Sequence, residues 1–369
     1  MIETEHYYID KHSDNTKYIV KILQNVKLKN NFIFIIDGLC LINRSKNTLF
    51  AECKNIFKNI EKLKNICKQK DKNFIILISL VGEAPTYRYN LKNFCDSINK
   101  IYDIKLKNIL IFSGAKHQFD EQVNYSITAI AMNNKLLFDF KNIFAEPKYH
   151  FIGLARIARP HRIHATIEII DRNLLKYGNC SLGSGYYYNI NENFDLNFVP
   201  EKYKNIFPMF IDGVIANETF DEQYKGNNEK LTHAFINYVQ ETSFEGDKEY
   251  HVWGVPFLTE KTTKPFAWGQ VPIFNCIQGN VEYVREFGFD LFDDIIDHSY
   301  DNITEPMIRI RKSIDQLEKI CSWSIKECVE YKHKNIDRFI KNRQIAENLE
   351  NLIIQNEIIN LQEAFDKYD

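Results

Sequence analysis

Short apolar runs alternate with amphipathic stretches through the first part of the chain. The runs at 32–36, 74–81 and 108–113 have the length and composition of buried strands. Between them, apolar positions within 48–70 and 91–101 recur with the spacing of one helix face. Strands that alternate with helices in this way are typical of a parallel sheet with crossover helices. The pattern therefore predicts an α/β domain.

A second series of the same kind follows in the middle of the chain. Strands are predicted at 150–154, 234–239 and 271–275. A helix is predicted over 160–176, because a proline opens it and Gly178 stands just beyond its end. We therefore expect a second α/β domain.

The last part of the chain is helical in its pattern. The apolar positions that mark its helix faces are Met307, Ile310, Ile314, Leu317, Cys321, Leu349, Leu352, Ile353 and Ile359. These helices are predicted either to pack back across the domains or to mediate self-association. The predicted organisation is an N-terminal domain over 1–148, a second domain over 149–304 and a helical extension over 305–369.

Composition narrows the class of protein. The chain has 369 residues, which favours two domains, and its 44% hydrophobic and 26% charged residues are typical of globular proteins. The polar, acidic start predicts no signal peptide, and no apolar run is long enough to span a bilayer. The eight cysteines form no Cys-x-x-Cys pair, so we expect reduced, mostly buried thiols in a cytoplasmic protein.

Charge is unevenly distributed although the formal net charge is only −2. Residues 1–150 contain 23 Lys and Arg against 15 Asp and Glu, a balance of +8; the remainder contains 24 against 34, a balance of −10. A basic N-terminal half is consistent with a nucleic-acid partner, but lysine-rich helices are also simply solvated faces. Both interpretations stay open.

The segment 257–274 carries the clearest chemical signal. Thr259 is predicted to cap a short helix that opens with Glu260 and Lys261, and Gly269 is predicted to end it before a buried strand. A carboxylate at this place can hold ribose hydroxyls, while the amine and the free helix N–H groups hold a diphosphate. The alternative is a capped surface helix with a solvated ion pair.

Three arginines surround the predicted start of an earlier helix. Arg156, Arg159 and Arg162 lie between a predicted strand and the helix that begins at Pro160. Arginine binds phosphate oxygens in a bidentate manner, and a helix N-terminus favours anions. The cluster therefore predicts phosphate binding, with a basic surface turn as the alternative.

Several residues that follow predicted strands are candidates for acid–base chemistry. Glu83 follows the second strand and is the first candidate for a general base, with a turn-capping role as the alternative. Asp37 and His117 follow the first and third strands and are reserve candidates. Glu241 follows a strand of the second domain and is predicted to contact a sugar, to order the loop or to cap a helix.

Several familiar motifs are absent from the sequence. There is no Gly-x-Gly-x-x-Gly, no Walker loop, no Gly-x-Ser-x-Gly and no Asp-x-Asp at a strand end. Phosphate binding is therefore predicted to depend on Arg and Lys, without a metal ion. The segment 297–301 is predicted to be mainly structural.

Taken together, these segments resemble glycosyltransferases of the GT-B type. The C-terminal half is similar to the donor domain of the α-1,3-fucosyltransferase and exostosin groups, which the segments 259–261 and 269–272 match. The similarity is closer to a little-characterised set of phage and giant-virus glycosyltransferases. These share Arg-Pro-His-Arg, here 159–162, a Glu-Thr pair, here 241–242, and a Gly-Phe to Ser-Tyr-Asp run, here 288–301.

The resemblance covers about 148–320 and implies an α/β fold with two Rossmann-like domains facing a cleft, the first on the acceptor side and the second binding the donor. By analogy with the fucosyltransferases, Glu83 would be the base, Glu260 the ribose ligand, and Lys261 with an arginine the diphosphate ligands. Pro265 departs from the pattern, because a proline inside the Glu-Lys helix should kink or shorten it.

The predicted function is transfer of a sugar from a UDP- or GDP-sugar to a hydroxyl group, with inversion and without a cofactor. The enzyme would act in the cytoplasm, or in the host cytoplasm if it is viral. The acceptor is either a hydroxylated base in phage DNA or a surface polysaccharide. Two other hypotheses remain: a non-catalytic nucleotide- or glycan-binding protein, and a helical scaffold with a degenerate enzyme core.

Overall fold

The computed structural model divides the chain into two compact units. It describes residues 2–3, 7–9, 19, 22–27, 31–37, 46–69, 73–80, 88–105, 108–113, 124–127, 145–155, 158–183, 199–207, 209, 229–242, 244, 256 and 258–366. The first unit gathers the described residues from 2 to 127 and from 350 to 366, and the second those from 145 to 349. Each unit holds a largely parallel sheet, so the α/β class is confirmed.

The sheet of the first unit has six strands in sequential order. They are β1 (Ile2–Glu3), β2 (Tyr7–Ile9), β3 (Asn31–Asp37), β4 (Asn73–Leu80), β5 (Ile109–Ser113) and β6 (Asn124–Ile127). Only β1 and β2 pair antiparallel; every other neighbour is parallel. The three long strands were predicted from their apolar runs, whereas β1, β2 and β6 were not.

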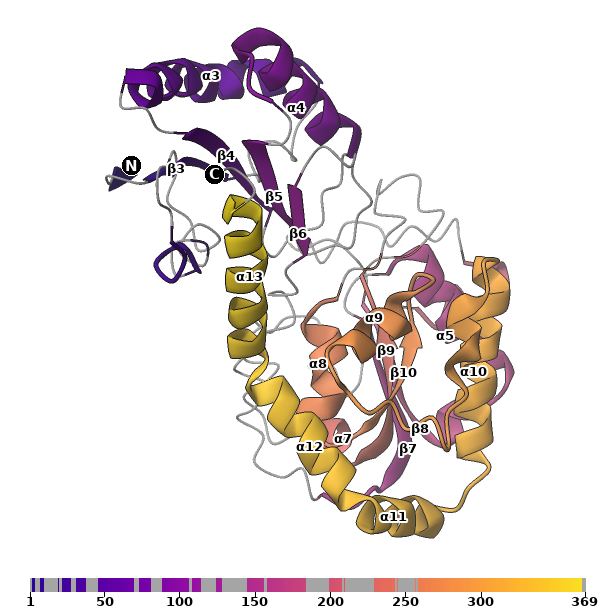
Figure 1. Ribbon diagram of the computed structural model, residues 1–369. Coiled ribbons are helices and arrows are strands. Elements are labelled where there is room, and N and C mark those ends of the chain that lie inside the picture. The colour runs from indigo at the N-terminus through magenta and orange to yellow at the C-terminus, as the bar shows by residue number, and fades with distance from the viewer. Residues whose placement is uncertain are drawn as a thin grey trace. The chain divides into compact units, whose positions relative to one another are not determined.

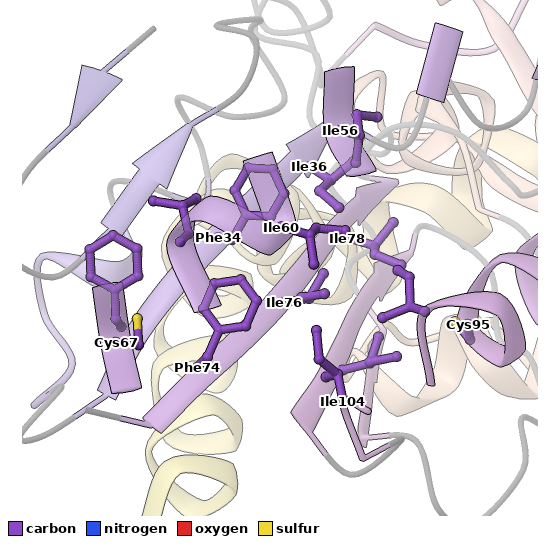
Figure 2. Packing of buried hydrophobic residues seen from close by; sticks show 14 of the residues in the cluster. Phe34, Ile36, Ile56, Ile60, Cys67, Phe74, Ile76, Ile78, Cys95 and Ile104 are labelled. Carbon is purple, nitrogen blue, oxygen red and sulfur yellow. The ribbon is translucent and has the colours of Figure 1, made fainter. Parts of the chain in front are cut away.

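Two helices cover one face of this sheet (Figure 1). They are α3 (Lys46–Gln69) and α4 (Arg88–Tyr102). Figure 2 shows the packing: alternate residues of β3 and β4, such as Phe34 and Ile76, meet Ile60 of α3. Each apolar side chain buried in this way contributes about 1.5–3 kcal/mol, so this face supplies much of the stability of the unit.

The sheet of the second unit has four parallel strands in the order β10-β9-β7-β8. They are β7 (Tyr149–Ala155), β8 (Gly178–Leu182), β9 (Ala234–Gln240) and β10 (Val271–Asn275). After β7 the chain moves outward to β8, and it then returns to the other side of β7 to form β9 and β10. The order therefore reverses between β7 and β9, and such a switch point is where open α/β sheets bind ligands, at the carboxyl ends of the strands.

Helices lie on both faces of the second sheet (Figure 1). α5 (Pro160–Asp171) and α10 (Pro306–Cys321) cover one face, and α8 (Glu260–Ala267) covers the other. The remaining helical segments of the unit are η4 (Leu174–Lys176), η6 (Glu201–Tyr203), α7 (Glu229–Thr232), α9 (Asn280–Glu286), η7 (His298–Asn302), α11 (Ile325–Lys334) and α12 (Ile336–Glu347).

The helix predicted over 160–176 is shorter than expected. α5 ends at Asp171, and Asn173 then adopts a left-handed conformation with φ 55° before a short 3₁₀ turn. Gly178 is not a helix cap but the first residue of β8, a strand that the sequence did not reveal. A Cβ atom at Gly178 would lie 2.3 Å from the carbonyl oxygen of Phe151, so only glycine permits this strand pairing.

The C-terminal helices divide between the units. α10, α11 and α12 belong to the second unit, whereas α13 (Leu349–Asp366) belongs to the first from Glu350 onward. Leu349 and Ile353 of α13 are buried as the pattern predicts, but Ile359 is 55% exposed and Leu361 is buried instead.

Two further expectations concern thiols and membranes. The six cysteines whose side chains are described are buried free thiols, as predicted: Cys67, Cys95, Cys180, Cys276, Cys321 and Cys328. Within the described ranges, no helix combines the length and apolar character that crossing a lipid bilayer requires.

Candidate functional site

The carboxyl end of β9 directs two adjacent side chains to opposite faces of the sheet. Successive residues of a strand point to opposite faces, so Gln240 and Glu241 separate here. Glu241 faces α8, where its carboxylate bonds to residues of that helix. Gln240 shares the face of Tyr238, whose hydroxyl lies 3.0 Å from Oγ of Ser313 in α10.

The buried carboxylate of Glu241 holds the beginning of α8. It accepts hydrogen bonds from the Thr242 and Thr259 backbone N–H groups at 3.0 and 3.4 Å and from Thr259 Oγ1 at 2.9 Å. The Thr262 hydroxyl also donates to it. Glu241 is 0% exposed, and these partners satisfy the carboxylate. It therefore orders the loop and the helix start, one of the roles predicted for it.

The first turn of α8 has the predicted capped structure. Thr259 is the N-cap, and its Oγ1 accepts from the Lys261 N–H at 3.2 Å. Lys261 Nζ lies 2.8 Å from a Glu260 oxygen, with both side chains partly exposed. Burial acts to raise the pKa of the Glu260 carboxyl, but the charges of Lys261 and Lys264 outweigh burial and leave the pKa below its ordinary value. The carboxylate is therefore ionised at neutral pH.

The end of α8 also follows the prediction. The helix stops at Ala267, and Gly269 takes the left-handed φ of 63° that a glycine tolerates best. Pro265 lies inside the helix, which has only eight residues, as expected for a helix shortened by proline.

Lys264 is a cation of this site that the sequence analysis missed. It is 8% exposed, and its Nζ lies 5.5 Å from the ring centre of Trp268. Burial lowers its pKa, while the nearby carboxylates of Glu260 and Glu241 act in the opposite direction. The available signal was its spacing: Lys264 stands four residues after Glu260, on the same helix face.

The first turn of α5 brings two predicted arginines to the end of β9. Arg159 is the N-cap residue, and its Nη1 donates to the carbonyl oxygen of Thr242 at 2.6 Å. Arg162 is 2% exposed, and its Nη2 donates to the carbonyl oxygen of Glu241 at 2.8 Å. Both guanidinium groups therefore lie at the switch point between β7 and β9, where the sheet order reverses.

His161 packs beside these arginines as a neutral side chain. Burial, together with the charges of Arg162 and Arg159, holds its pKa well below the ordinary value. Its Nε2 lies 3.0 Å from the carbonyl oxygen of Glu241, so this nitrogen carries the proton. The ring stacks on Phe244 at 4.6 Å, and the Arg309 guanidinium lies 5.2 Å from the same Phe244 ring. This stack fixes the loop after β9 against α5 and α10.

The structure thus brings six predicted binding residues into one connected cluster: Arg159, Arg162, Glu241, Thr259, Glu260 and Lys261. Glu83, His117 and Arg156 lie outside the described residues. Asp37 ends β3, and its side chain is not among those described.

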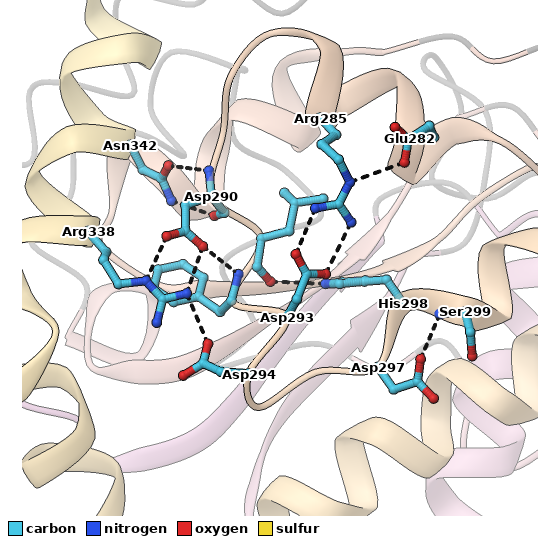
Figure 3. Close-up of polar contacts among 12 residues, drawn as sticks. Glu282, Arg285, Asp290, Asp293, Asp294, Asp297, His298, Ser299, Arg338 and Asn342 are labelled. Atoms are coloured by element: carbon cyan, nitrogen blue, oxygen red, sulfur yellow. Dashed lines mark hydrogen bonds and ion pairs between the residues drawn. The ribbon is translucent and has the colours of Figure 1, made fainter.

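The Gly-Phe to Ser-Tyr-Asp run forms an ion-pair network (Figure 3). Arg338 of α12 bonds to Asp290 at 2.6 Å and to Asp294 at 2.9 Å, and Arg285 bonds to Asp293 at 2.7 Å. Phe292 takes a positive φ of 60°, held by a hydrogen bond from its N–H to Asp290. The run attaches α12 to the second unit, consistent with the structural role predicted for its last segment.

The cluster offers cations, helix N–H groups and one ionised carboxylate, which are groups that bind an oxyanion and a polyol. In the described part of the chain, no three His, Cys, Asp or Glu side chains gather as metal ligands do. No family model matches the chain, and no curated protein or solved structure shows significant similarity to it.

Proposed function

We propose that the second unit binds the nucleoside diphosphate of a nucleotide sugar and that the protein is a glycosyltransferase. The observation that carries this proposal is the convergence of the α5 and α8 N-termini, with Arg159 and Lys261, on the carboxyl edge of a doubly wound parallel sheet. Such an edge is the usual ligand site of this sheet type.

The partly exposed cations are assigned to the diphosphate. Arg159 and Lys261 retain access to solvent, and both stand at a helix N-terminus that favours anions. Arg162 is buried against Glu241, so we assign it to positioning the loop after β9. Glu260 is assigned to the ribose hydroxyls, because its lowered pKa keeps it an acceptor at neutral pH.

The proposed reaction is an inverting transfer in which an acceptor oxygen attacks the anomeric carbon and the nucleoside diphosphate leaves. Cationic groups stabilise the charge that develops on the departing phosphate, which is commonly the largest catalytic contribution. Glu83 is proposed as the base that takes the acceptor proton. The acceptor is proposed to be a hydroxylated DNA base, with a saccharide as the alternative, and the basic N-terminal half of the sequence favours DNA.

Binding of UDP and GDP by calorimetry tests the first step. Arg159→Ala and Lys261→Ala are each expected to weaken binding by about 10- to 100-fold, since a charge-assisted hydrogen bond contributes about 1.5–3 kcal/mol. Lys326→Ala is the matched control, because it removes one positive charge from an exposed position on α11.

Three outcomes are informative. Loss of binding in both site variants but not in the control supports the diphosphate site. Wild-type protein that binds neither nucleotide contradicts it. Binding without hydrolysis of any UDP- or GDP-sugar, even with acceptor DNA or saccharide present, would favour the non-catalytic alternative.

A further inference from the structure

Two buried side-chain amides at the carboxyl edge of the second sheet have unfilled hydrogen-bond sites. Gln240 is 1% exposed, and among the described residues neither its Nε2 nor its Oε1 has a partner. Asn275 is 2% exposed, and its Oδ1 likewise has no partner there. Buried amides are nearly always hydrogen-bonded. Other unpartnered amide atoms occur in the described residues, as in Asn280, but Gln240 and Asn275 are neighbours on adjoining strands.

The two amides lie next to each other on one face. Asn275 ends β10 in direct register with Gln240 of β9, so both side chains point to the same side of the sheet. Asn275 Nδ2 donates to the carbonyl oxygen of His161 at 3.4 Å, which places the pair beneath the first turn of α5. That turn also carries Arg159 and Arg162.

The same two strands contain an equivalent pair that is satisfied. Asn237 of β9 donates to Gln270 Oε1 at 2.8 Å, and Gln270 Nε2 donates to the carbonyl oxygen of Leu231 at 2.6 Å. Gln270, just before β10, is as buried as Gln240. Neighbouring amides at this depth in the sheet can therefore be satisfied within the fold.

We propose that the amides of Gln240 and Asn275 bind the neutral part of the ligand, a group that carries both a hydrogen-bond donor and an acceptor. This inference rests on the proposed function, in which Arg159 of the same α5 turn and Lys261 of α8 hold the diphosphate. The nucleobase edge and the sugar hydroxyls share the required chemistry. Such buried amides discriminate strongly between ligands, because a ligand without the hydrogen-bonding group leaves them unpaired.

The test is Gln240→Met, which keeps the side-chain length and removes both hydrogen-bonding atoms. Replacing unpartnered polar atoms with apolar ones should leave the thermal midpoint unchanged or raise it. Binding is measured for UDP, GDP, UDP-glucose and GDP-mannose. We expect about tenfold weaker binding of the ligands that wild-type protein binds. A loss already present with the diphosphates identifies the base as the partner, and a loss seen only with the sugars identifies the hydroxyls.

Gln270→Met is the matched control. It removes an amide that is fully engaged, so it should lower the thermal midpoint and leave ligand affinity unchanged once the protein is folded. Weaker ligand binding without loss of stability in Gln240→Met, together with the reverse in Gln270→Met, is the signature of a ligand role, because a purely structural amide cannot produce both.

Two results overturn the inference. Unchanged affinity in Gln240→Met, with wild-type protein binding a nucleotide, shows that the Gln240 amide does not bind the ligand. A strongly destabilised Gln240→Met shows that the amide is a structural partner. Failure of wild-type protein to bind any of the four probes instead contradicts the proposed function itself.

Discussion

Two sets of buried polar residues at the carboxyl edge of the second sheet differ in how their hydrogen bonds are satisfied. On the α8 face, Glu241 is satisfied by two hydroxyl and two backbone N–H donors, and Asn237 is paired with Gln270. On the α5 face, Gln240 and Asn275 retain unfilled hydrogen-bond sites within the described residues. The residues are of similar type and burial, so the difference lies in what the surroundings supply.

The difference separates residues that complete the fold from residues whose hydrogen-bond sites remain open within the described residues. Glu241 and its donors satisfy one another and hold the start of α8 in place, so they contribute to folding. An unpartnered buried group costs about 1–3 kcal/mol of folding free energy, and sites of that kind persist where a ligand can complete them. This difference is the observation on which the proposed ligand role of Gln240 and Asn275 rests.

Glu241→Ala gives the largest effect that this comparison predicts. Removing the carboxylate leaves four buried donors without an acceptor, so the free energy of unfolding should fall by about 3–5 kcal/mol. Urea unfolding followed by circular dichroism measures it. The neighbouring Gln240→Met should cause no loss, although the two residues are adjacent in the chain.

Glu241→Gln provides the control for this prediction. It keeps the shape and one acceptor oxygen, so about half of the loss is expected. Equal losses in Glu241→Ala and Gln240→Met would show that the two faces do not differ, and the comparison would fail.

The sequence predicted the parts of this site that depend on local chemistry. The Thr259 cap, the proline at the start of α5 and the apolar runs of β7, β9 and β10 all act through near neighbours, so their patterns are visible in one chain. β8 was missed because Gly178 is required by the approach of Phe151, which lies 27 residues earlier. The sequence also could not predict that the Gln240 amide lacks partners, since only the packed sheet shows which donors and acceptors approach it.

Lys332 extends the comparison of buried polar groups to an amine. Its side chain is buried, and its Nζ donates to the Ala145 carbonyl oxygen at 2.9 Å. Burial lowers its pKa to about 8, from an ordinary value of 10.5. Between these pH values the unfolded chain binds more protons than the native protein, so stability should rise with pH across this window. The gain is on the order of 3 kcal/mol for a shift of this size.

Lys332→Met should remove that rise. Thermal unfolding of wild-type protein and the variant is measured between about pH 8 and pH 10, and the slopes of stability against pH are compared. The other lysines and tyrosines contribute equally to both proteins, so their contributions cancel in the difference. Lys326→Met, at an exposed position, is the control and should keep the wild-type slope. Parallel curves for wild-type protein and Lys332→Met would show that burial of this amine carries no cost.

Asp301 has hydrogen-bond partners for only one of its two carboxylate oxygens among the described residues. Its substitution should give the smallest change in stability of these predictions. Its Oδ2 accepts from the Val281 and Glu282 N–H groups at 3.2 and 3.3 Å, while its Oδ1 has no partner among the described residues. Burial raises the pKa of this carboxyl to about 6, against hydrogen bonds that act to lower it. Since the native protein binds the extra proton, the Asp301 contribution should weaken as pH rises from about 4 to about 6, by on the order of 3 kcal/mol.

Asp301→Asn isolates this contribution. The amide keeps an acceptor for the start of α9 but does not titrate, so the variant should be more stable than wild-type protein at pH 7 and about equally stable near pH 4. Carboxylates with lowered pKa, such as Asp290 beside Arg338, change their contribution mainly below about pH 4, and they are common to both proteins and cancel. A variant that is less stable than wild-type protein at pH 7 would show that the charge on Asp301 stabilises the native protein, and would contradict this prediction.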